Sequence, residues 1–221
     1  KDNNFSNITL SGTTAFFGIR STGGSTPVQA VEVSGNTISN VLTGSGTAIG
    51  IQTGYEKIGS FVNGNIIQDI TGTGIIRGLY IGRSGSLAAG SLVCSLNTVN
   101  GLKTTGAFAV TGILNSAAVA NDIFKNKIYN IEANNPSGSV DAMQVALGTA
   151  VNVYNNIIGD LRTPSSNLAN PLVGINVLGG TTVSVDHNTV VLNGASTGAL
   201  FGSSAFAVSA TPTNPVFLRN N

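Results

Sequence analysis

The chain has 221 residues, only 9% of them charged, and its 10 basic and 9 acidic residues nearly balance. That balance excludes the electrostatic footprint of a surface for nucleic acid or anionic lipid, and no apolar run approaches the roughly 18 residues of a membrane helix. We therefore expect no nucleic-acid partner and no membrane insertion, and the 29 Gly, the absence of Trp and the many β-branched residues favour strands over helices.

A short motif that begins with an asparagine recurs along the whole chain. It first reads NNFSNI from Asn3, NTISNV from Asn36 and NIIQDI from Asn65. It continues as NTVNGL, NKIYNI, NIIGDL and NTVVLN from Asn97, Asn126, Asn156 and Asn188, and the chain stops at Asn221. The intervals between these asparagines are 29 to 33 residues. Regular self-similarity at such a period is the signature of a repeat architecture.

Three strand signals occur in each repeat. Two apolar residues separated by one position precede the asparagine, as in Val31 and Val33, and the motif itself alternates in the same way. A third alternating segment follows at 15–20, 48–52, 75–81, 108–114, 140–147, 172–177 and 204–209. The period of two predicts strands with one buried face. Loops rich in Gly, Ser, Thr and Pro absorb the variation in repeat length, at 21–27, 83–90, 134–139 and 163–171.

These signals predict an all-β protein, a single-domain right-handed parallel β-helix over residues 1–221. No window has the 3.6-residue period of a helix, and the repeats are shorter than the roughly 40–45 residues of a propeller blade and lack its hairpin turns. The solenoid should have about seven coils of about 31 residues, with the right-handed sense of other parallel crossovers. Seven coils at about 4.8 Å each give a rod about 34 Å long.

Equivalent residues of successive coils should stack into columns about 4.8 Å apart. One buried column is predicted to contain Val33, Val62, Cys94, Ile123, Val153, Val185 and Leu218. A second is predicted to contain Ile38, Ile67, Val99, Ile128, Ile158 and Val190. Cys94, the single cysteine, is therefore expected to be a buried small apolar residue and not a reactive thiol.

The repeated asparagines should form a ladder at the corner between two strands. A side-chain amide both donates and accepts, so stacked asparagines can bond one another and the bent backbone, and Asn tolerates the left-handed conformation that such corners need. The predicted ladder comprises Asn36, Asn65, Asn97, Asn126, Asn156 and Asn188. A second, broken polar ladder is predicted four residues later, at Asn7, Asn40, Asp69, Asn130 and Asp160, with Gly101 and Leu192 interrupting it.

The pattern Asn-x-Ile-x-Asn-Ile followed by Gly-Ile-x-Ile resembles the right-handed parallel β-helix repeats of pectate-lyase-like proteins. It is most similar to the repetitive versions in large secreted bacterial surface proteins, and the resemblance covers the whole chain. The resemblance implies a fold but not one activity, because that superfamily includes polysaccharide lyases, glycosidases, tailspikes and non-enzymatic adhesins or stalks.

The carboxylates are not arranged for glycoside hydrolysis, which needs two of them about 5–5.5 Å or 6.5–9.5 Å apart. When the position of each carboxylate is counted from the ladder asparagine of its own coil, only Glu132 and Asp160 are expected to lie near each other, in adjacent coils. No group of carboxylates could fill a calcium shell. The only His, His187, follows Asp186, and we expect the two side chains on opposite faces. We predict a protein that is not an enzyme and that holds no cofactor and no metal.

One outward patch stands out as a candidate binding surface. Phe124 and Tyr154 each lie two residues before a ladder asparagine, in adjacent coils, so their rings should stack on the solvent face. Tyr129 should lie across the corner, with Lys125 and Lys127 beside it. Stacked aromatic rings beside polar groups could bind surface glycans or a protein. They could equally stiffen the sheet, as cross-strand aromatic pairs do.

The ends of the rod raise the question of partners, because a β-helix exposes unpaired strand edges unless it is capped. Neither end shows an amphipathic cap helix, so we expect flanking coils or head-to-tail copies of the chain to cover them, and the isolated chain to aggregate or polymerise. The first residues, 1–4, do not resemble a signal peptide, which suggests a removed signal or a segment of a longer chain.

The leading functional prediction is a non-catalytic structural or adhesive module of an extracellular or cell-surface bacterial protein, such as a stalk, adhesin or fibre. The alternative is a β-helix that binds or degrades polysaccharide, with an active site that is degenerate or lies outside this segment.

Overall fold

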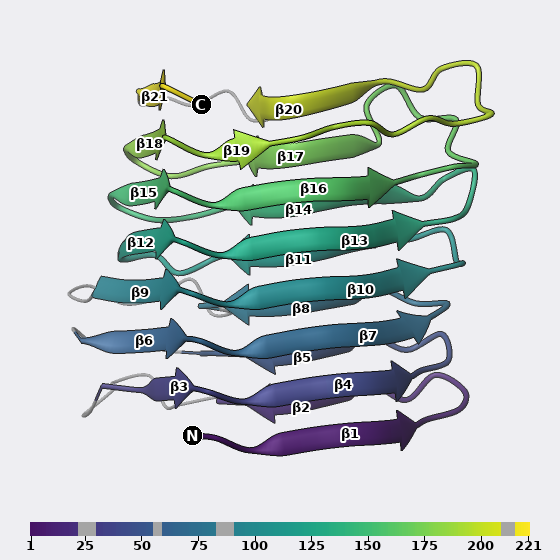
Figure 1. Cartoon of the computed structure of the whole chain (residues 1–221), viewed down its shortest axis with the longest axis horizontal. Helices are drawn as coiled ribbons and strands as arrows, with labels where there is room; N and C mark the ends of the chain where they lie inside the picture. Colours follow the sequence, from purple (N-terminus) through teal and green to yellow (C-terminus); the bar gives the residue numbers. More distant parts are fainter. Residues whose placement is uncertain (22–29, 55–58, 83–90, 209–214) are drawn as a thin grey trace.

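The computed structural model describes residues 1–21, 30–54, 59–82, 91–208 and 215–221. The chain coils into a parallel β-solenoid in which each turn adds one strand to each of three sheets (Figure 1). The predicted loop at 83–90 and residues 22–27 of the loop at 21–27 lie outside the described residues. No helix of the described part is long and apolar enough to cross a membrane.

Sheet A follows the asparagine corner and forms the front of the stack in Figure 1. Its strands are β1 (Asn4–Thr9), β4 (Thr37–Leu42), β7 (Ile66–Gly72), β10 (Thr98–Thr104), β13 (Lys127–Ala133), β16 (Ile157–Arg162) and β19 (Thr189–Val190).

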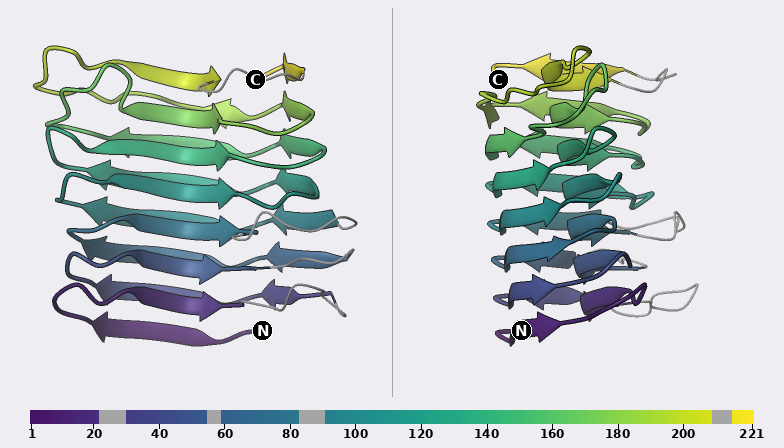
Figure 2. Two further views of the ribbon diagram at one scale, coloured as in Figure 1. Left: turned by 180° about the vertical axis from the view of Figure 1, so that it is seen from behind. Right: turned by 90° about the vertical axis from the view of Figure 1, so that its right-hand side faces the viewer.

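Sheet B lies behind sheet A, as the views of Figure 2 show. Its strands are β2 (Phe16–Arg20), β5 (Ala48–Gln52), β8 (Ile76–Ile81), β11 (Ala109–Asn115), β14 (Ser139–Val145), β17 (Leu172–Val177) and β20 (Ser203–Val208). The sequence predicted each of these strands to within two residues at either end.

Sheet C precedes the corner and is made of short strands. They are β3 (Glu32–Ser34), β6 (Ser60–Asn63), β9 (Ser91–Ser95), β12 (Ala120–Phe124), β15 (Val151–Tyr154), β18 (Val183–Asp186) and β21 (Val216–Arg219). Since each sheet has seven strands, six full turns separate its first and last strands. The right-handed sense of the coil stays an expectation from the crossover rule.

The predicted columns are confirmed by the pairing register. Val33 pairs with Val62, Val62 with Cys94, and the series continues in register to Leu218. Within it, Val62, Cys94, Ile123, Val153 and Val185 are at most 1% exposed. The second column, from Ile38 upward, stacks in sheet A and is fully buried except at Val190. The apolar core therefore runs along the axis between the three sheets.

The left-handed backbone conformation lies one residue before each ladder asparagine and not at the asparagine itself. The φ angle there is between 50° and 65° at Asp2, Gly35, Gly64, Leu96, Lys125, Asn155, His187 and Asn220. None of the ladder asparagines is among the described residues with positive φ, so the prediction was wrong about which residue makes the bend. Leu96 and Lys125 show that the corner imposes this conformation even on side chains that disfavour it.

The prediction of a second polar ladder needs correction. Its residues share a left-handed backbone conformation but are not joined by a continuous series of hydrogen bonds. Asn7, Asn40, Asp69, Gly101, Asn130 and Asp160 all have φ between 48° and 64°. Among the described contacts, one bond joins neighbouring members, from Asn40 Nδ2 to Asn7 Oδ1 at 2.5 Å. Gly101 is thus a full member of this series. In the last coil Leu192 takes the position, and β19 ends two residues earlier, at Val190.

Candidate functional site

The predicted asparagine ladder is present as an unbroken series of hydrogen bonds. The backbone N–H and the Nδ2 of Asn97 both donate to Oδ1 of Asn126, at 3.0 Å each, and Asn126 donates in the same way to Asn156. The same pair of bonds runs from Asn3 through Asn36 and Asn65, and on to Asn188 and Asn221. The six predicted members are at most 3% exposed.

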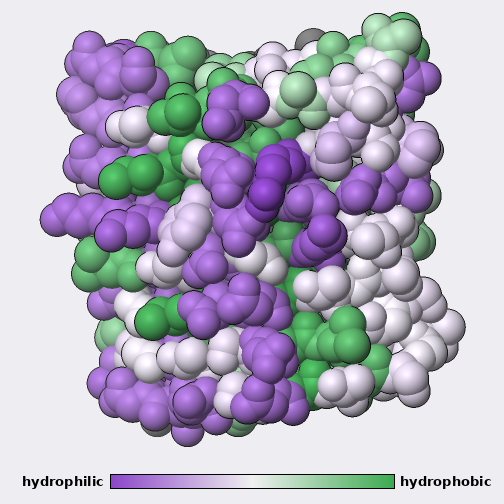
Figure 3. Space-filling view, turned by 45° about the vertical axis from the view of Figure 1, so that its right-hand side comes forward, coloured by the Kyte–Doolittle hydropathy of each residue, from purple (hydrophilic) through white to green (hydrophobic). Residues whose placement is uncertain are grey.

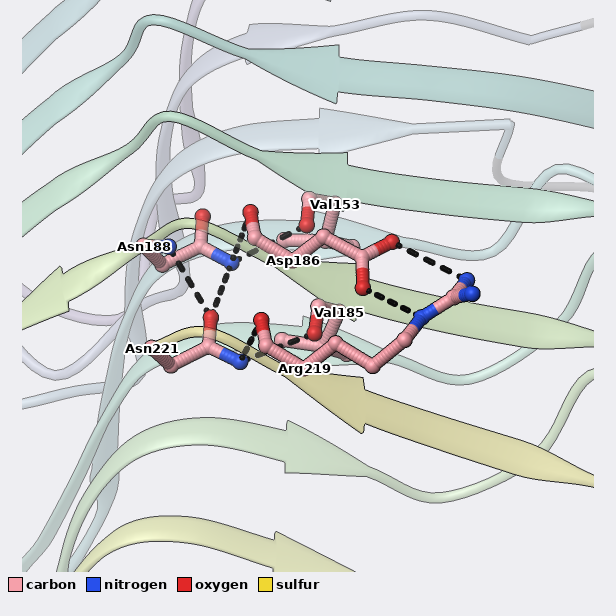
Figure 4. A network of polar contacts seen from close by, with 6 residues as sticks. All are labelled: Val153, Val185, Asp186, Asn188, Arg219 and Asn221. Atoms are coloured by element: carbon pink, nitrogen blue, oxygen red, sulfur yellow. Dashed lines mark hydrogen bonds and ion pairs between the residues drawn. The ribbon is translucent and has the colours of Figure 1, made fainter.

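A third bond ties the ladder amides from Asn65 onward to the buried column beside them, whereas Nδ2 of Asn36 donates to the carbonyl of Ser34. Nδ2 of Asn126 donates to the carbonyl of Cys94 at 3.0 Å, and Nδ2 of Asn188 donates to the carbonyl of Val153 at 3.0 Å. Figure 4 shows this arrangement at the last two corners, where Asn221 repeats it with Val185. A buried amide without hydrogen-bond partners is costly. At this corner both the donor and the acceptor of each Asn side chain are bonded, which explains why Asn recurs there.

The predicted aromatic pair is also present. The rings of Phe124 and Tyr154 stack with centroids 4.8 Å apart and an angle of 7° between their planes. Lys125 makes the left-handed bend next to Phe124. Lys127 and Tyr129 lie beyond the corner on β13, so they belong to sheet A. The structure therefore joins Phe124 and Tyr154 into one surface and places Lys127 and Tyr129 on the neighbouring sheet.

A shallow hollow of about 480 Å³ extends along sheet C from this aromatic pair. Two polar contacts organise it: Asn152 Nδ2 donates to Asp122 Oδ1 at 2.8 Å, and Arg219 Nε donates to Asp186 Oδ1 at 2.9 Å. Its lining includes Asp122, Asn152, Tyr154, Asp186, His187 and Arg219. Partial burial, with the charge of Asp122, raises the pKa of the Tyr154 hydroxyl. The hollow thus presents a ring edge, an amide, two carboxylates and a guanidinium.

This hollow was not predicted from the sequence, although some of its polar contacts join residues at equivalent positions of adjacent coils. Asp122 and Asn152 hold equivalent positions in adjacent coils, as do Asp186 and Arg219. The expectation that Asp186 and His187 face opposite sides was wrong, because both line the hollow. Alternation holds only along a strand, and His187 is at the corner with a φ of 56°.

The one close carboxylate pair predicted from sequence belongs to an ionic column. Arg162 Nε lies 3.7 Å from Glu132 and 3.5 Å from Asp160, and Lys103 Nζ lies 2.7 Å from Glu132 on the other side. Lys103, Glu132 and Arg162 occupy equivalent positions of three successive strands. Alternating charge at one position supports the stacking of the sheet, as cross-strand pairs do.

Glu32 has a partner in the coil below it. Lys1 Nζ lies 2.5 Å from Glu32 Oε1, and Ser34 Oγ donates to the same oxygen at 2.8 Å. These two hydrogen bonds lower the pKa of the Glu32 carboxyl. This ion pair ties the first corner of the chain to β3.

Asp141 is the buried carboxylate of the described chain, at 9% exposure on the outer side of β14. Gln144 Nε2 donates to its Oδ2, and Asn176 Nδ2 donates to its Oδ1 at 3.2 Å. Burial nevertheless raises the pKa of Asp141, which shows that these bonds only partly offset the loss of water.

We expect Asp141→Asn to be more stable than the native chain at neutral pH. Because the folded pKa is raised, the native state holds this proton more tightly, and stability falls as pH rises from the ordinary Asp pKa of about 3.9 towards the raised value. Thermal unfolding from pH 3 to pH 8 measures this: the variant should gain most above that window and little below it. Asp160→Asn removes an exposed carboxylate as a control, and an equal pH-dependent gain there would contradict the assignment to Asp141.

Cys94 is a buried free thiol, as predicted. Its side chain is fully buried, and burial raises the pKa of the thiol to about 12, although Asn97 Nδ2 lies 3.5 Å from the sulfur. A thiol that stays protonated in an apolar core is chemically inert.

The C-terminal end of the core is open. A largely apolar hollow of about 250 Å³ lies there, lined by inward residues of the last coils, among them Ile175, Val185, Val190, Phe206 and Leu218. Leu218 is 50% exposed, whereas the residues below it in its column are buried. Figure 3 shows hydrophilic and hydrophobic side chains interspersed on the face it presents, with hydrophobic ones reaching the upper end.

Among the described residues, no group of three or more His, Cys, Asp or Glu side chains is placed to hold a metal ion. Comparison of the chain with family models, with curated proteins and with solved structures finds no match.

Proposed function

We propose that this chain is a non-catalytic structural module of an extracellular or cell-surface bacterial protein, of the stalk, adhesin or fibre type within the pectate-lyase-like superfamily. In this role the solenoid is continued end to end by further coils or by copies of itself. The module supplies length and stiffness, because the ladder and the core columns are uniform along the axis.

The observation that carries this proposal is the exposure of core positions in the last coil. Leu218 is 50% exposed, while Val153 and Val185, below it in its column, are at most 1% exposed. Burying a leucine side chain is worth roughly 1.5–3 kcal/mol. A further coil would recover that free energy by closing the column.

The polar groups also support a structural role. The ladder amides bond one another, and the charged residues Lys103, Glu132 and Arg162 pair along a column. These side chains are occupied by contacts between coils, which is what a module selected for stiffness requires.

A tandem chain tests the proposal. Residues 1–221 joined directly to 4–221 continue the repeat in phase, because Asn4 would follow Asn221 as it follows Asn3. A Leu218→Cys substitution in the first unit should then react with a thiol reagent about tenfold or more slowly than in the single chain, since burial removes access. Leu96→Cys is the control, because Leu96 is 56% exposed away from the junction. Equal labelling of Leu218→Cys in both chains would refute end-to-end continuation.

A second candidate function, glycan binding, is favoured by the stacked rings of Phe124 and Tyr154 beside the hollow on sheet C. The amide of Asn152 and the carboxylates of Asp122 and Asp186 can bond sugar hydroxyls, while the stacked rings add an apolar edge. Two carboxylates against one guanidinium favour a neutral glycan over an acidic one.

We expect the double substitution of Phe124→Ser and Tyr154→Ser to weaken retention on a neutral glucan in affinity electrophoresis by about three- to tenfold. Polygalacturonate should retain the native chain less than the glucan does. Phe61→Ser removes an outward aromatic from β6 of the same sheet and serves as the control. Unchanged retention of the double variant would rule out the aromatic pair as a sugar platform.

A further inference from the structure

Gly101 opens a gap among the outward side chains of sheet A. It has a φ of 64° and holds the position that Asp69 and Asn130 hold in the coils on either side. Those two residues share its left-handed conformation, each with a φ of 55°. Their Cα atoms are about 9.6 Å apart along the axis, twice the spacing of neighbouring strands, and no side chain stands between them.

A hollow of about 300 Å³ lies at this gap, with Asp69, Thr71, Gly101, Lys103 and Asn130 in its lining. A Cβ at residue 101 would clash with Asp69 Oδ1, so the carboxylate of Asp69 leans into the space that a side chain would fill. The volume is at the lower end of the range for small-molecule sites, roughly 300–1,000 Å³.

Three polar groups of this hollow have hydrogen-bonding capacity to spare. Among the described residues, no hydrogen bond or ion pair reaches the carboxylate of Asp69 or the hydroxyl of Thr71. Asn130 accepts a bond from Arg162 Nη2 through its Oδ1, and no described residue accepts from its Nδ2. The hollow therefore offers an acceptor, a donor and a hydroxyl that can serve as either.

The charges around the hollow leave one carboxylate without a cation. Glu132 lies between Lys103 Nζ at 2.7 Å and Arg162 Nε at 3.7 Å, and Arg162 Nε is also 3.5 Å from Asp160. Two cations thus balance two carboxylates, and the negative charge of Asp69 is in excess. A ligand with one positive charge would complete the balance.

We propose that the hollow at Gly101 binds an amino sugar with a free amine. The ammonium group pairs with the carboxylate of Asp69 in a charge-assisted hydrogen bond, and the ring hydroxyls bond Asn130 Nδ2 and the hydroxyl of Thr71. Acetylation of the amine removes the charge, so the acetylated sugar loses this ion pair. The site is on sheet A, and neither function proposed above depends on it.

Titration with single sugars, followed by NMR of the isotope-labelled chain, tests the site. At about pH 6, where the amine is protonated, we expect methyl glucosaminide to bind about tenfold or more tightly than methyl N-acetylglucosaminide. Methyl glucoside should bind as weakly as the acetylated sugar. The amide signals of Asp69, Gly101 and Asn130 should shift. The proposal is overturned if the free amine binds no more tightly than the acetylated sugar, or if these signals do not move.

Gly101→Asn closes the hollow without removing a polar group. Asn already takes the same left-handed conformation at Asn40 and Asn130, so the backbone at residue 101 suits it. The new Cβ would lie 2.9 Å from the backbone N of Asp69, which requires a small shift of the chain. We expect methyl glucosaminide to bind this variant about tenfold or more weakly, and thermal unfolding checks that the fold is kept. Native affinity in a folded Gly101→Asn chain would refute the site.

Asp69→Asn is the independent test, because it removes the charge and keeps the shape. It should weaken binding of methyl glucosaminide about tenfold or more and leave the acetylated sugar unaffected. Asp160→Asn removes a carboxylate from the same series of left-handed positions but outside the lining of the hollow, so binding should stay at the native level. An equal loss in both variants would assign binding to overall charge and overturn the proposal.

Discussion

Asn126→Ala should lower the free energy of unfolding by about 3–5 kcal/mol, the largest effect of any single substitution considered for this chain. The substitution removes four buried hydrogen bonds: two from Asn97, one to Asn156 and one to the carbonyl of Cys94. The buried N–H of Asn97 would then lose its acceptor, the carbonyl of Cys94 would lose the bond from Asn126, and Nδ2 of Asn97 would keep only its contacts with the carbonyl of Val62 and the sulfur of Cys94. Urea denaturation followed by circular dichroism measures the loss.

The matched control is Asn152→Ala, which removes an exposed amide and one bond to Asp122. We expect that variant to change stability by no more than about 0.5 kcal/mol. A second variant, Asn126→Asp, keeps the shape and the acceptor but cannot donate while ionised, so it should be as damaging at pH 7 and less so in acid. If Asn126→Ala costs under about 1 kcal/mol, the ladder is not a main source of stability.

The Cys94 thiol should react with a thiol reagent at pH 8 about a thousandfold or more slowly in the native chain than in the urea-unfolded chain. Two causes act together. The side chain is fully buried, and burial raises the pKa of the thiol to about 12, so very little thiolate forms. Timed labelling followed by mass spectrometry gives both rates.

Leu96→Cys supplies the positive control for this experiment, because that position is 56% exposed two residues further along the chain. In that variant one label should add quickly and the second only on unfolding. Native labelling of Cys94 within about tenfold of the unfolded rate would mean that this part of the core opens readily. Asn126→Ala should itself speed the labelling, since the backbone carbonyl of Cys94 accepts a bond from Asn126.

The asparagine ladder and the hollow on sheet C have different roles. The ladder residues are buried and bonded to one another, so they stabilise the stack and offer nothing to a ligand. The hollow on sheet C is open and lined by residues from four successive coils, including Asp122, Tyr154, Asp186 and Arg219. Stability measurements and glycan retention therefore separate the two roles, because Phe124→Ser and Tyr154→Ser leave every ladder bond in place.

The periodicity of the residues is enough to specify the solenoid. Alternation at Val31 and Val33 defines strands with one buried face, and the recurrence of asparagine every 29 to 33 residues defines the coil. Once coils stack in register, residues with equal offsets become neighbours. That is why the ladder, the buried column through Cys94 and the contact between Phe124 and Tyr154 could all be predicted from residue numbers.

Two features became clear only from the packing of the coils. They are the backbone positions that bend, and the contacts between side chains that do not hold equivalent positions in adjacent coils. The bend before each ladder asparagine is made by residues as different as Gly64, Leu96 and His187, so no residue type marks it. Contacts such as Lys1 with Glu32, and the burial of Asp141, depend on how far side chains reach over neighbouring strands. A repeat encodes the position of each residue along the coil, whereas the direction and reach of a side chain are determined only when the coils pack.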